Sequence, residues 1–123
     1  MSHFADLLAT DPAHRLLVIK SAADHASRAH RGQFRKDRKT PYITHPARVA
    51  CLVGMFNGSH RAVIAAWLHD VYEDCSPEWI LKTDELIDGF PLPADERRDI
   101  AAIVDALTKK NTIKGKAARL SDS

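Results

Sequence analysis

The pattern of apolar and polar residues along the chain has the period of helices, and strict strand-like alternation is absent apart from a short extended piece near Pro41 to Ile43. Asp11-Pro12 is typical of a helix start, with Asp11 as N-cap, and the helix is expected to reach about His30. A shorter helix from about His3 to Ala9 is expected before it. The apolar residues that recur at helical spacing in the long helix are Leu16, Leu17, Ile19, Ala22, Ala23 and Ala26.

Two further helices are predicted in the middle of the chain, after a polar loop from Gln33 to Tyr42. Thr44 is the expected N-cap of the first, which ends near Asn57-Gly58, and Ser59 is the expected N-cap of the second, which runs to about Asp74. The apolar face of the first is expected to consist of Ala47, Val49, Ala50, Leu52, Val53 and Phe56. The apolar face of the second is expected to consist of Ala62, Ala65, Leu68 and Tyr72.

The last third of the chain is also predicted to be helical. Ser76-Pro77 should begin one or two short helices, divided near Thr83 and closed by Gly89. A further helix with an acidic first turn is expected from Ala94 to Lys109. The sequence leaves open whether residues 111–123 are ordered or form a flexible tail. The predicted fold class is therefore all-α.

Composition limits the classes of protein. A chain of 123 residues, 45% hydrophobic and 28% charged, fits a single soluble domain over residues 1–123. No membrane span or secretory leader is expected, which predicts a cytoplasmic protein. A net charge of +2 is too small to indicate a general DNA- or RNA-binding protein. Cys51 and Cys75 form no disulfide framework or metal motif and are interpreted as packing residues. The oligomeric state stays open.

The predicted central helix changes character abruptly at its end. Its apolar run leads directly into His69 and Asp70, and Glu73 and Asp74 follow one helical turn later. An isolated buried charge costs several kcal/mol, so carboxylates here must be paired, solvated or bound to metal. A divalent cation would meet this requirement.

Three ordered motifs carry a resemblance to a known family. They are AHRGQFRK at residues 29–36, TPYITHP at residues 40–46 and LHDVYED at residues 68–74. Together they resemble the HD-superfamily hydrolase domain of RelA/SpoT proteins and their small stand-alone relatives, over roughly residues 15 to 110. The resemblance implies a helical bundle of about five to six helices and a manganese-dependent (p)ppGpp 3′-pyrophosphohydrolase that releases pyrophosphate.

The resemblance also implies which residues hold the metal. His45, His69 and Asp70 match the family's ligands, and imidazole with carboxylate suits a catalytic ion such as Mn²⁺. Family members supply a fourth ligand, an aspartate in a Lys-Leu-Ala-Asp-like motif on a later helix. Residues 119–122 resemble this motif locally but come sooner after residue 109 than in the family, so Asp122 is a candidate fourth ligand. The alternative is a shortened domain with three protein ligands.

Other matched positions imply roles towards water and substrate. Glu73 and Asp74 would activate or position the attacking water, and Arg35 and Lys36 would bind substrate phosphates. Tyr42 could stack on a base or cover the core. The motif departs from the family at residues 71 and 72, where valine and tyrosine replace two aliphatic residues.

Several of these residues can also be interpreted without a role in catalysis. The basic loop could be an ordinary solvated charge run. The remaining histidines are interpreted as surface or helix-face residues, namely His3, His14, His25, His30 and His60. Two other functions stay open: a non-catalytic truncated HD domain that binds nucleotide or metal, and an HD phosphohydrolase that acts on another nucleotide.

Overall fold

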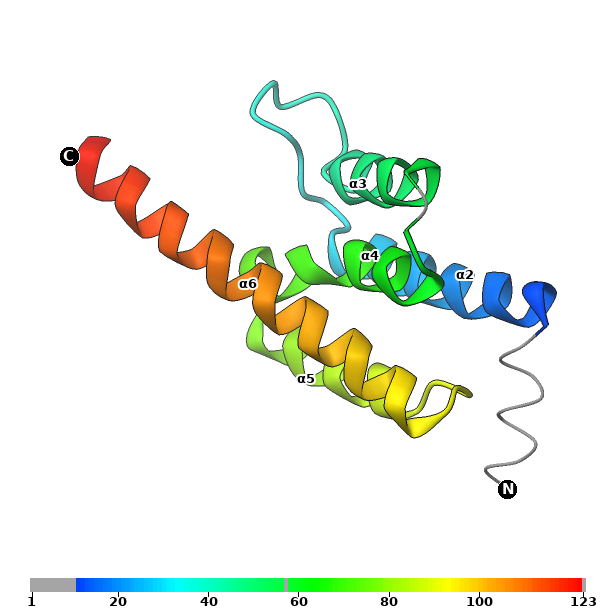
Figure 1. Ribbon diagram of the computed structural model, residues 1–123. Coiled ribbons are helices and arrows are strands. Elements are labelled where there is room, and N and C mark those ends of the chain that lie inside the picture. The colour runs from blue at the N-terminus through cyan, green and yellow to red at the C-terminus, as the bar shows by residue number, and fades with distance from the viewer. Residues whose placement is uncertain (1–10, 57, 123) are drawn as a thin grey trace.

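The computed structural model describes residues 11–56 and 58–122, and side chains in this part as far as Thr108. Its helices are α2 (Pro12–Ala29), α3 (Thr44–Met55), α4 (His60–Asp74), α5 (Pro77–Asp88) and α6 (Ala94–Asp122) (Figure 1). Within the described residues there is no strand, only an isolated antiparallel bridge between Phe34 and Pro41. The predicted all-α fold is therefore confirmed. The expected helix at residues 3–9 lies outside the described residues.

Helix α4 is the centre of the bundle. It contacts each of the other four helices, and Figure 1 shows it between α3 on one side and the α5–α6 pair on the other. Ile64, Ala65 and Leu68 of α4 are fully buried, as predicted for the last two. The other core side chains come from α2, α5, α6 and the connection between α5 and α6. They are Val18, Ala22, Ile87, Phe90, Leu92, Ile100 and Val104. Burial of this apolar surface is the main force that holds α4 in place.

Two of the predicted helix caps are present and one is not. The side chain of Asp11 accepts a hydrogen bond from the Ala13 amide, and Ser59 accepts one from the Ala62 amide. Thr44 is the first residue of α3 rather than its N-cap, so that prediction was wrong. The preceding residue, Ile43, already has helical dihedral angles, and the Thr44 hydroxyl donates to the carbonyl of Pro41 at 2.8 Å.

Of the one or two helices expected after Ser76, the structure has one: α5 is continuous through Thr83, ends at Asp88 and has Gly89 as its C-cap. Thr83 is fully buried, where an unsatisfied hydroxyl would be costly. Its hydroxyl donates to the Trp79 carbonyl one turn earlier at 2.7 Å and lies 2.8 Å from Nε2 of His25. A polar residue in the middle of α5 therefore joins α5 to α2 instead of dividing α5.

The buried face of α2 differs from the predicted one. Val18, Ala22, Ala26 and Ala29 are buried, whereas Leu16 and Leu17 are each 65% exposed. The same occurs on α3, where Ala50 is buried but Leu52 and Phe56 are largely exposed. Cys51 is exposed, so it is not the packing residue that was expected, whereas Cys75 is half-buried.

Helix α6 begins at Ala94 with its acidic first turn, as predicted, and continues beyond the expected end at Lys109 to Asp122. Glu96 in this first turn is buried and lies 2.8 Å from the ring of His60 and 3.4 Å from the guanidinium of Arg61. This link ties the start of α6 to the start of α4. No described helix combines the length and apolarity that crossing a membrane requires.

The central position of α4 gives a prediction for stability. Leu68 is fully buried, so Leu68→Ala should lower the free energy of unfolding by about 2–5 kcal/mol. Leu81 on α5 is 65% exposed, and Leu81→Ala is the matched control, with an expected change within about 0.5 kcal/mol. Urea denaturation followed by circular dichroism measures both. Equal losses in the two variants would show that α4 is not the centre of the core.

Candidate active site

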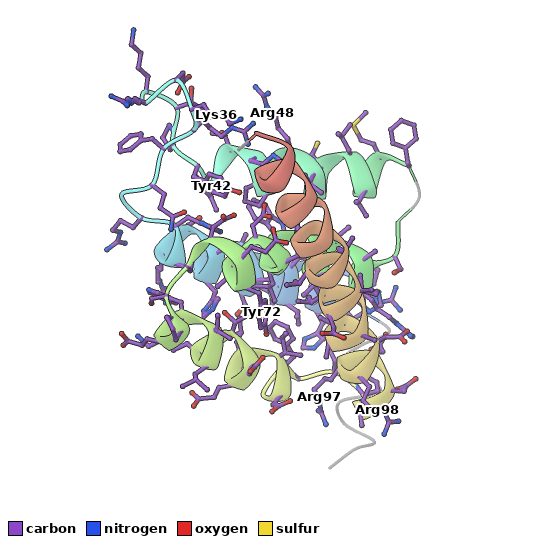
Figure 2. All side chains as sticks on the ribbon, turned by 90° about the vertical axis from the view of Figure 1, so that its left-hand side faces the viewer. Lys36, Tyr42, Arg48, Tyr72, Arg97 and Arg98 are labelled. Atoms are coloured by element: carbon purple, nitrogen blue, oxygen red, sulfur yellow. The ribbon has the colours of Figure 1, made fainter. Side chains whose placement is uncertain are left out.

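The candidate site lies at the carboxyl end of α4, where it meets the loop between α2 and α3 and the first turn of α3. His69 and Asp70 are buried, with 5% and 3% of their surfaces exposed, whereas Glu73 and Asp74 one turn later are exposed. His45 is half-buried in the first turn of α3. Figure 2 shows Lys36, Tyr42 and Arg48 together at this end of the molecule. The structure therefore brings together residues from three separate stretches of sequence.

The carboxylate of Asp70 is the meeting point of the three predicted metal ligands. Its Oδ1 lies 3.1 Å from Nε2 of His69, and its Oδ2 lies 3.5 Å from Nε2 of His45. Oδ2 is buried and has no hydrogen-bond partner among the described residues. A buried carboxylate oxygen without a donor, facing an imidazole nitrogen, is an arrangement that a cation would complete.

The ring of His69 is oriented by the backbone of its own helix. Its Nδ1 lies 2.8 Å from the carbonyl oxygen of Ala66, which can only accept, so Nδ1 donates this hydrogen bond. Neutral His69 therefore has its lone pair on Nε2, on the side of Asp70. This is how metal-binding histidines are usually fixed, through a hydrogen bond from the other ring nitrogen.

Burial and charge act in opposite directions on the His69–Asp70 pair. Burial alone lowers the pKa of His69, but the hydrogen bond and charge of Asp70 outweigh it, and the pKa rises above 6.5. Burial alone raises the pKa of Asp70, but His69 and the nearby rings of His45 and His30 bring it below its ordinary value. The pair therefore favours the ionised carboxylate and the protonated imidazole.

Glu73 and Asp74 lie beside Asp70, as the helical spacing predicted. One oxygen from each of the three carboxylates can be chosen so that all lie within 4.8 Å of one another. Among the described residues, these three carboxylates form a group that is close enough together to hold one metal ion. It adds two exposed carboxylates to the buried one, and oxygen ligands suit hard divalent cations. The three carboxylates therefore fit a divalent cation, whereas His45 and His69 approach Asp70 without joining this group.

Tyr42 connects the loop to the end of α4. Its hydroxyl donates to Oδ2 of Asp74 at 2.7 Å, and its ring lies 4.8 Å from that of His30 and 5.9 Å from that of His45. Burial, together with the hydrogen bond to Asp74, raises the pKa of Tyr42, so the phenol stays protonated at neutral pH. The half-buried ring therefore helps to position Asp74 and also lines the cavity beside Arg35.

Backbone hydrogen bonds and the carboxylate of Asp37 fix the conformation of the loop that carries Arg35 and Lys36. The Arg35 amide donates to the Thr40 carbonyl, and Asp37 accepts hydrogen bonds from the Lys39 and Thr40 amides and from the Thr40 hydroxyl. The hydroxyl and the amides lower the pKa of Asp37 to about 2. Arg35 and Lys36 remain exposed and line a cavity of about 580 Å³, together with Phe34, Asp37 and Tyr42. Both predicted phosphate-binding residues therefore face open space beside the site.

His30 is a site residue that the sequence analysis missed. It was expected at the surface, but only 2% of it is exposed, so that interpretation was wrong. Its Nδ1 lies 2.9 Å from Oε1 of Gln33, and the Gln33 amide group donates to the carbonyl of Asp74 at 2.9 Å. Cys75 also lies against His30, at 3.5 Å. This network fastens the end of α2 to the end of α4, and its only sign in the sequence is that both residues fall within the AHRGQFRK motif.

Asp122 lies in α6, but its side chain is outside the described part of the structure, so its role as a ligand stays a prediction.

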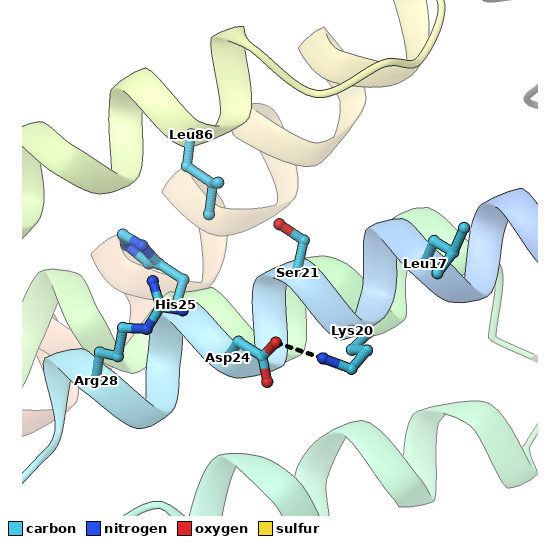
Figure 3. A pocket seen from close by; sticks show the side chains of 7 residues that line it. All are labelled: Leu17, Lys20, Ser21, Asp24, His25, Arg28 and Leu86. Atoms are coloured by element: carbon cyan, nitrogen blue, oxygen red, sulfur yellow. Dashed lines mark hydrogen bonds and ion pairs between the residues drawn. The ribbon is translucent and has the colours of Figure 1, made fainter.

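Figure 3 shows a cavity of about 330 Å³ between α2 and α5 that contains none of the predicted site residues. Lys20 and Asp24 form an ion pair at 2.7 Å within it, so part of its charge is neutralised internally.

Comparison with known proteins identifies the family of the chain. The family model described as HD domain matches residues 22–123. The guanosine-3′,5′-bis(diphosphate) 3′-pyrophosphohydrolase of Haemophilus influenzae is 40% identical over 86 residues, which are 70% of this chain and 11% of the relative. The human protein of the same name, MESH1, is 40% identical over 95 residues, which are 73% of this chain and 49% of the relative.

A third relative extends the match along the chain. The bifunctional (p)ppGpp synthase/hydrolase SpoT of Escherichia coli is 30% identical over 103 residues, which are 84% of this chain and 13% of the relative. The chain thus spans about half, or much less, of the length of these relatives. The comparison with solved structures gave no significant match. On the family match and the identities above, the chain belongs to the HD-domain family.

Proposed function

We propose that this protein hydrolyses the 3′-pyrophosphate of a guanosine alarmone, (p)ppGpp, with release of pyrophosphate. The observation that carries the proposal is the convergence of His45 and His69 on the buried carboxylate of Asp70, beside a cationic loop. The relatives support the substrate, because each is named for (p)ppGpp hydrolysis.

In this proposal His45, His69 and Asp70 hold a divalent cation, with Mn²⁺ as the expected ion and Asp122 as the candidate fourth ligand. The orphaned Oδ2 of Asp70 and the oriented Nε2 of His69 support the assignment. When bound, such an ion supplies Lewis-acid polarisation of a phosphoryl group and lowers the pKa of water.

The two acidic residues beyond the pair have different roles in the proposal. The Tyr42 phenol already donates to Asp74, which fixes that carboxylate and suits it to positioning. Glu73 is exposed one turn from His69 and Asp70, where it can accept a proton from the attacking water. The products are then GDP or GTP and pyrophosphate.

Arg35 and Lys36 bind the phosphates in this proposal. Arginine offers a planar fork for two phosphate oxygens, and lysine adds a compact charge. Both face the cavity that also contains Tyr42, half-buried and within 6.0 Å of the Arg35 guanidinium. The loop therefore presents positive charge on the side where a polyanionic nucleotide would approach the buried carboxylate.

The first test is turnover of ppGpp with added Mn²⁺. Glu73→Gln should keep metal and ppGpp binding but lower pyrophosphate release by about 10²-fold or more, because proton transfer loses its acceptor. Glu85→Gln, an exposed glutamate on α5, is the matched control and should leave turnover unchanged. If the wild-type protein binds Mn²⁺ and ppGpp but releases no pyrophosphate, the protein is a binding module and not an enzyme.

The second test is metal binding and its dependence on pH. His69→Ala and Asp70→Ala should each abolish stoichiometric Mn²⁺ binding while the helical circular dichroism is retained, and His14→Ala on the far end of α2 is the control. Protons compete with the metal for Nε2 of His69, whose pKa lies above 6.5. Affinity should therefore be constant at higher pH and fall as the pH drops through that pKa. An affinity that does not change with pH would argue against histidine ligation.

The third test separates phosphate binding from stability at the loop. Arg35→Ala and Lys36→Ala should weaken ppGpp binding while the free energy of unfolding changes by no more than about 0.5 kcal/mol, since both side chains are exposed. Lys39→Ala removes a charge from the same loop, but Lys39 does not line the cavity that contains Arg35 and Lys36, so this change should have little effect on binding. Loss of stability with normal ppGpp affinity would assign Arg35 and Lys36 a structural role.

A further inference from the structure

Besides the cavity that contains Lys36 and Tyr42, another cavity at the candidate site lies beside Arg35 and the first turn of α3. Its volume is about 330 Å³, and it is lined by Arg35, Asp37, Thr40, Thr44, His45 and Arg48. It adjoins the cavity that contains Lys36 and Tyr42, because Arg35 and Asp37 line both. Arg48 has no part in the sequence motifs or in the mechanism proposed above.

Arg48 reaches this cavity because of its place on α3. It follows His45 by three residues, which puts both on one face of the helix. Long side chains on a helix lean over the preceding turn, which here contains Thr44 and His45. Figure 2 shows Arg48 at the same end of the molecule as Lys36 and Tyr42, whereas Arg97 and Arg98 lie at the opposite end.

The charge of the cavity is not balanced from within. Among the residues whose side chains the structure describes, Asp37 is the only acidic one that lines this cavity, and its two oxygens already accept three hydrogen bonds from Lys39 and Thr40. Among the described residues, no hydrogen bond or ion pair joins the guanidinium of Arg48 or of Arg35 to a carboxylate. The hydroxyls of Thr40 and Thr44 are also engaged, with Asp37 and with the carbonyl of Pro41. Two guanidinium groups therefore line one cavity beside His45, and an anion would relieve their repulsion.

We propose that Arg48 is a second phosphate-binding residue, which together with Arg35 clamps a diphosphate group of the substrate in the cavity beside His45. The identity of the substrate rests on the proposed function, but the clamp itself requires only a diphosphate anion. Arginine is suited to this role because its planar fork binds two phosphate oxygens at once. The clamp places that group next to the residue that begins the metal site.

The experiment is titration calorimetry of the full chain with inorganic pyrophosphate, in EDTA so that no free divalent cation competes. Arg48→Ala should raise the Kd about tenfold or more, since it removes a charge-assisted hydrogen-bonding group. Arg48→Lys, which keeps the charge but loses the fork, should fall between wild type and Arg48→Ala. Arg98→Ala, an exposed arginine on α6, should match wild type. Equal affinities for wild type and Arg48→Ala, or no pyrophosphate binding by wild type, would overturn the proposal.

Kinetics with ppGpp and Mn²⁺ distinguish this inference from the proposed function. The KM of Arg48→Ala for ppGpp should rise about tenfold with a much smaller change in kcat, and its Tm should equal that of wild type. Turnover with an unchanged KM would overturn the clamp and leave the enzyme intact. If Arg48→Ala binds pyrophosphate more weakly than wild type, but the wild-type protein does not hydrolyse ppGpp, the clamp is supported and the hydrolase is rejected.

Discussion

The buried carboxylate of Asp70 is the constraint on which the site depends. A carboxylate with only 3% of its residue exposed must be compensated by positive charge or hydrogen bonds, because its desolvation costs several kcal/mol. Here the compensation comes from His69 on the same helix and from His45 on α3. The buried charge therefore links α3 to α4, because one histidine from each helix lies beside a different oxygen of Asp70.

The same helix supplies both the core and the site. Leu68 and Val71 are fully buried on either side of the His69–Asp70 pair. Since successive residues of a helix point in different directions, this short stretch can pack into the core while it directs two ionisable groups towards the loop. Motion of the site relative to the core would require α4 to leave its contacts with the other helices. A rigid scaffold of this kind suits a metal site, whose ligands must keep their geometry.

Much of the fold and part of the site could be predicted from local sequence signals. The caps at Asp11 and Ser59 are local interactions, and they are present as predicted. Burial is not local, and it was predicted less well: Leu16 is exposed although it fits the helical period, whereas His30 is buried. Which face of a helix is covered depends on where the other helices pack. A role for Arg48 could not be predicted for the same reason, because its cavity forms only when the loop folds against α3.

The site has a basic side and an acidic side, and this separation affects how a substrate and a metal ion would bind. The loop and α3 present Arg35, Lys36 and Arg48 around the cavities, while the end of α4 presents Asp70, Glu73 and Asp74. A polyanionic substrate is attracted by the basic side and repelled by the acidic side. A divalent cation on the acidic side would remove that repulsion, so in the proposed enzyme metal and substrate favour each other's binding. By the reciprocity of linkage, the substrate must strengthen metal binding by the same factor.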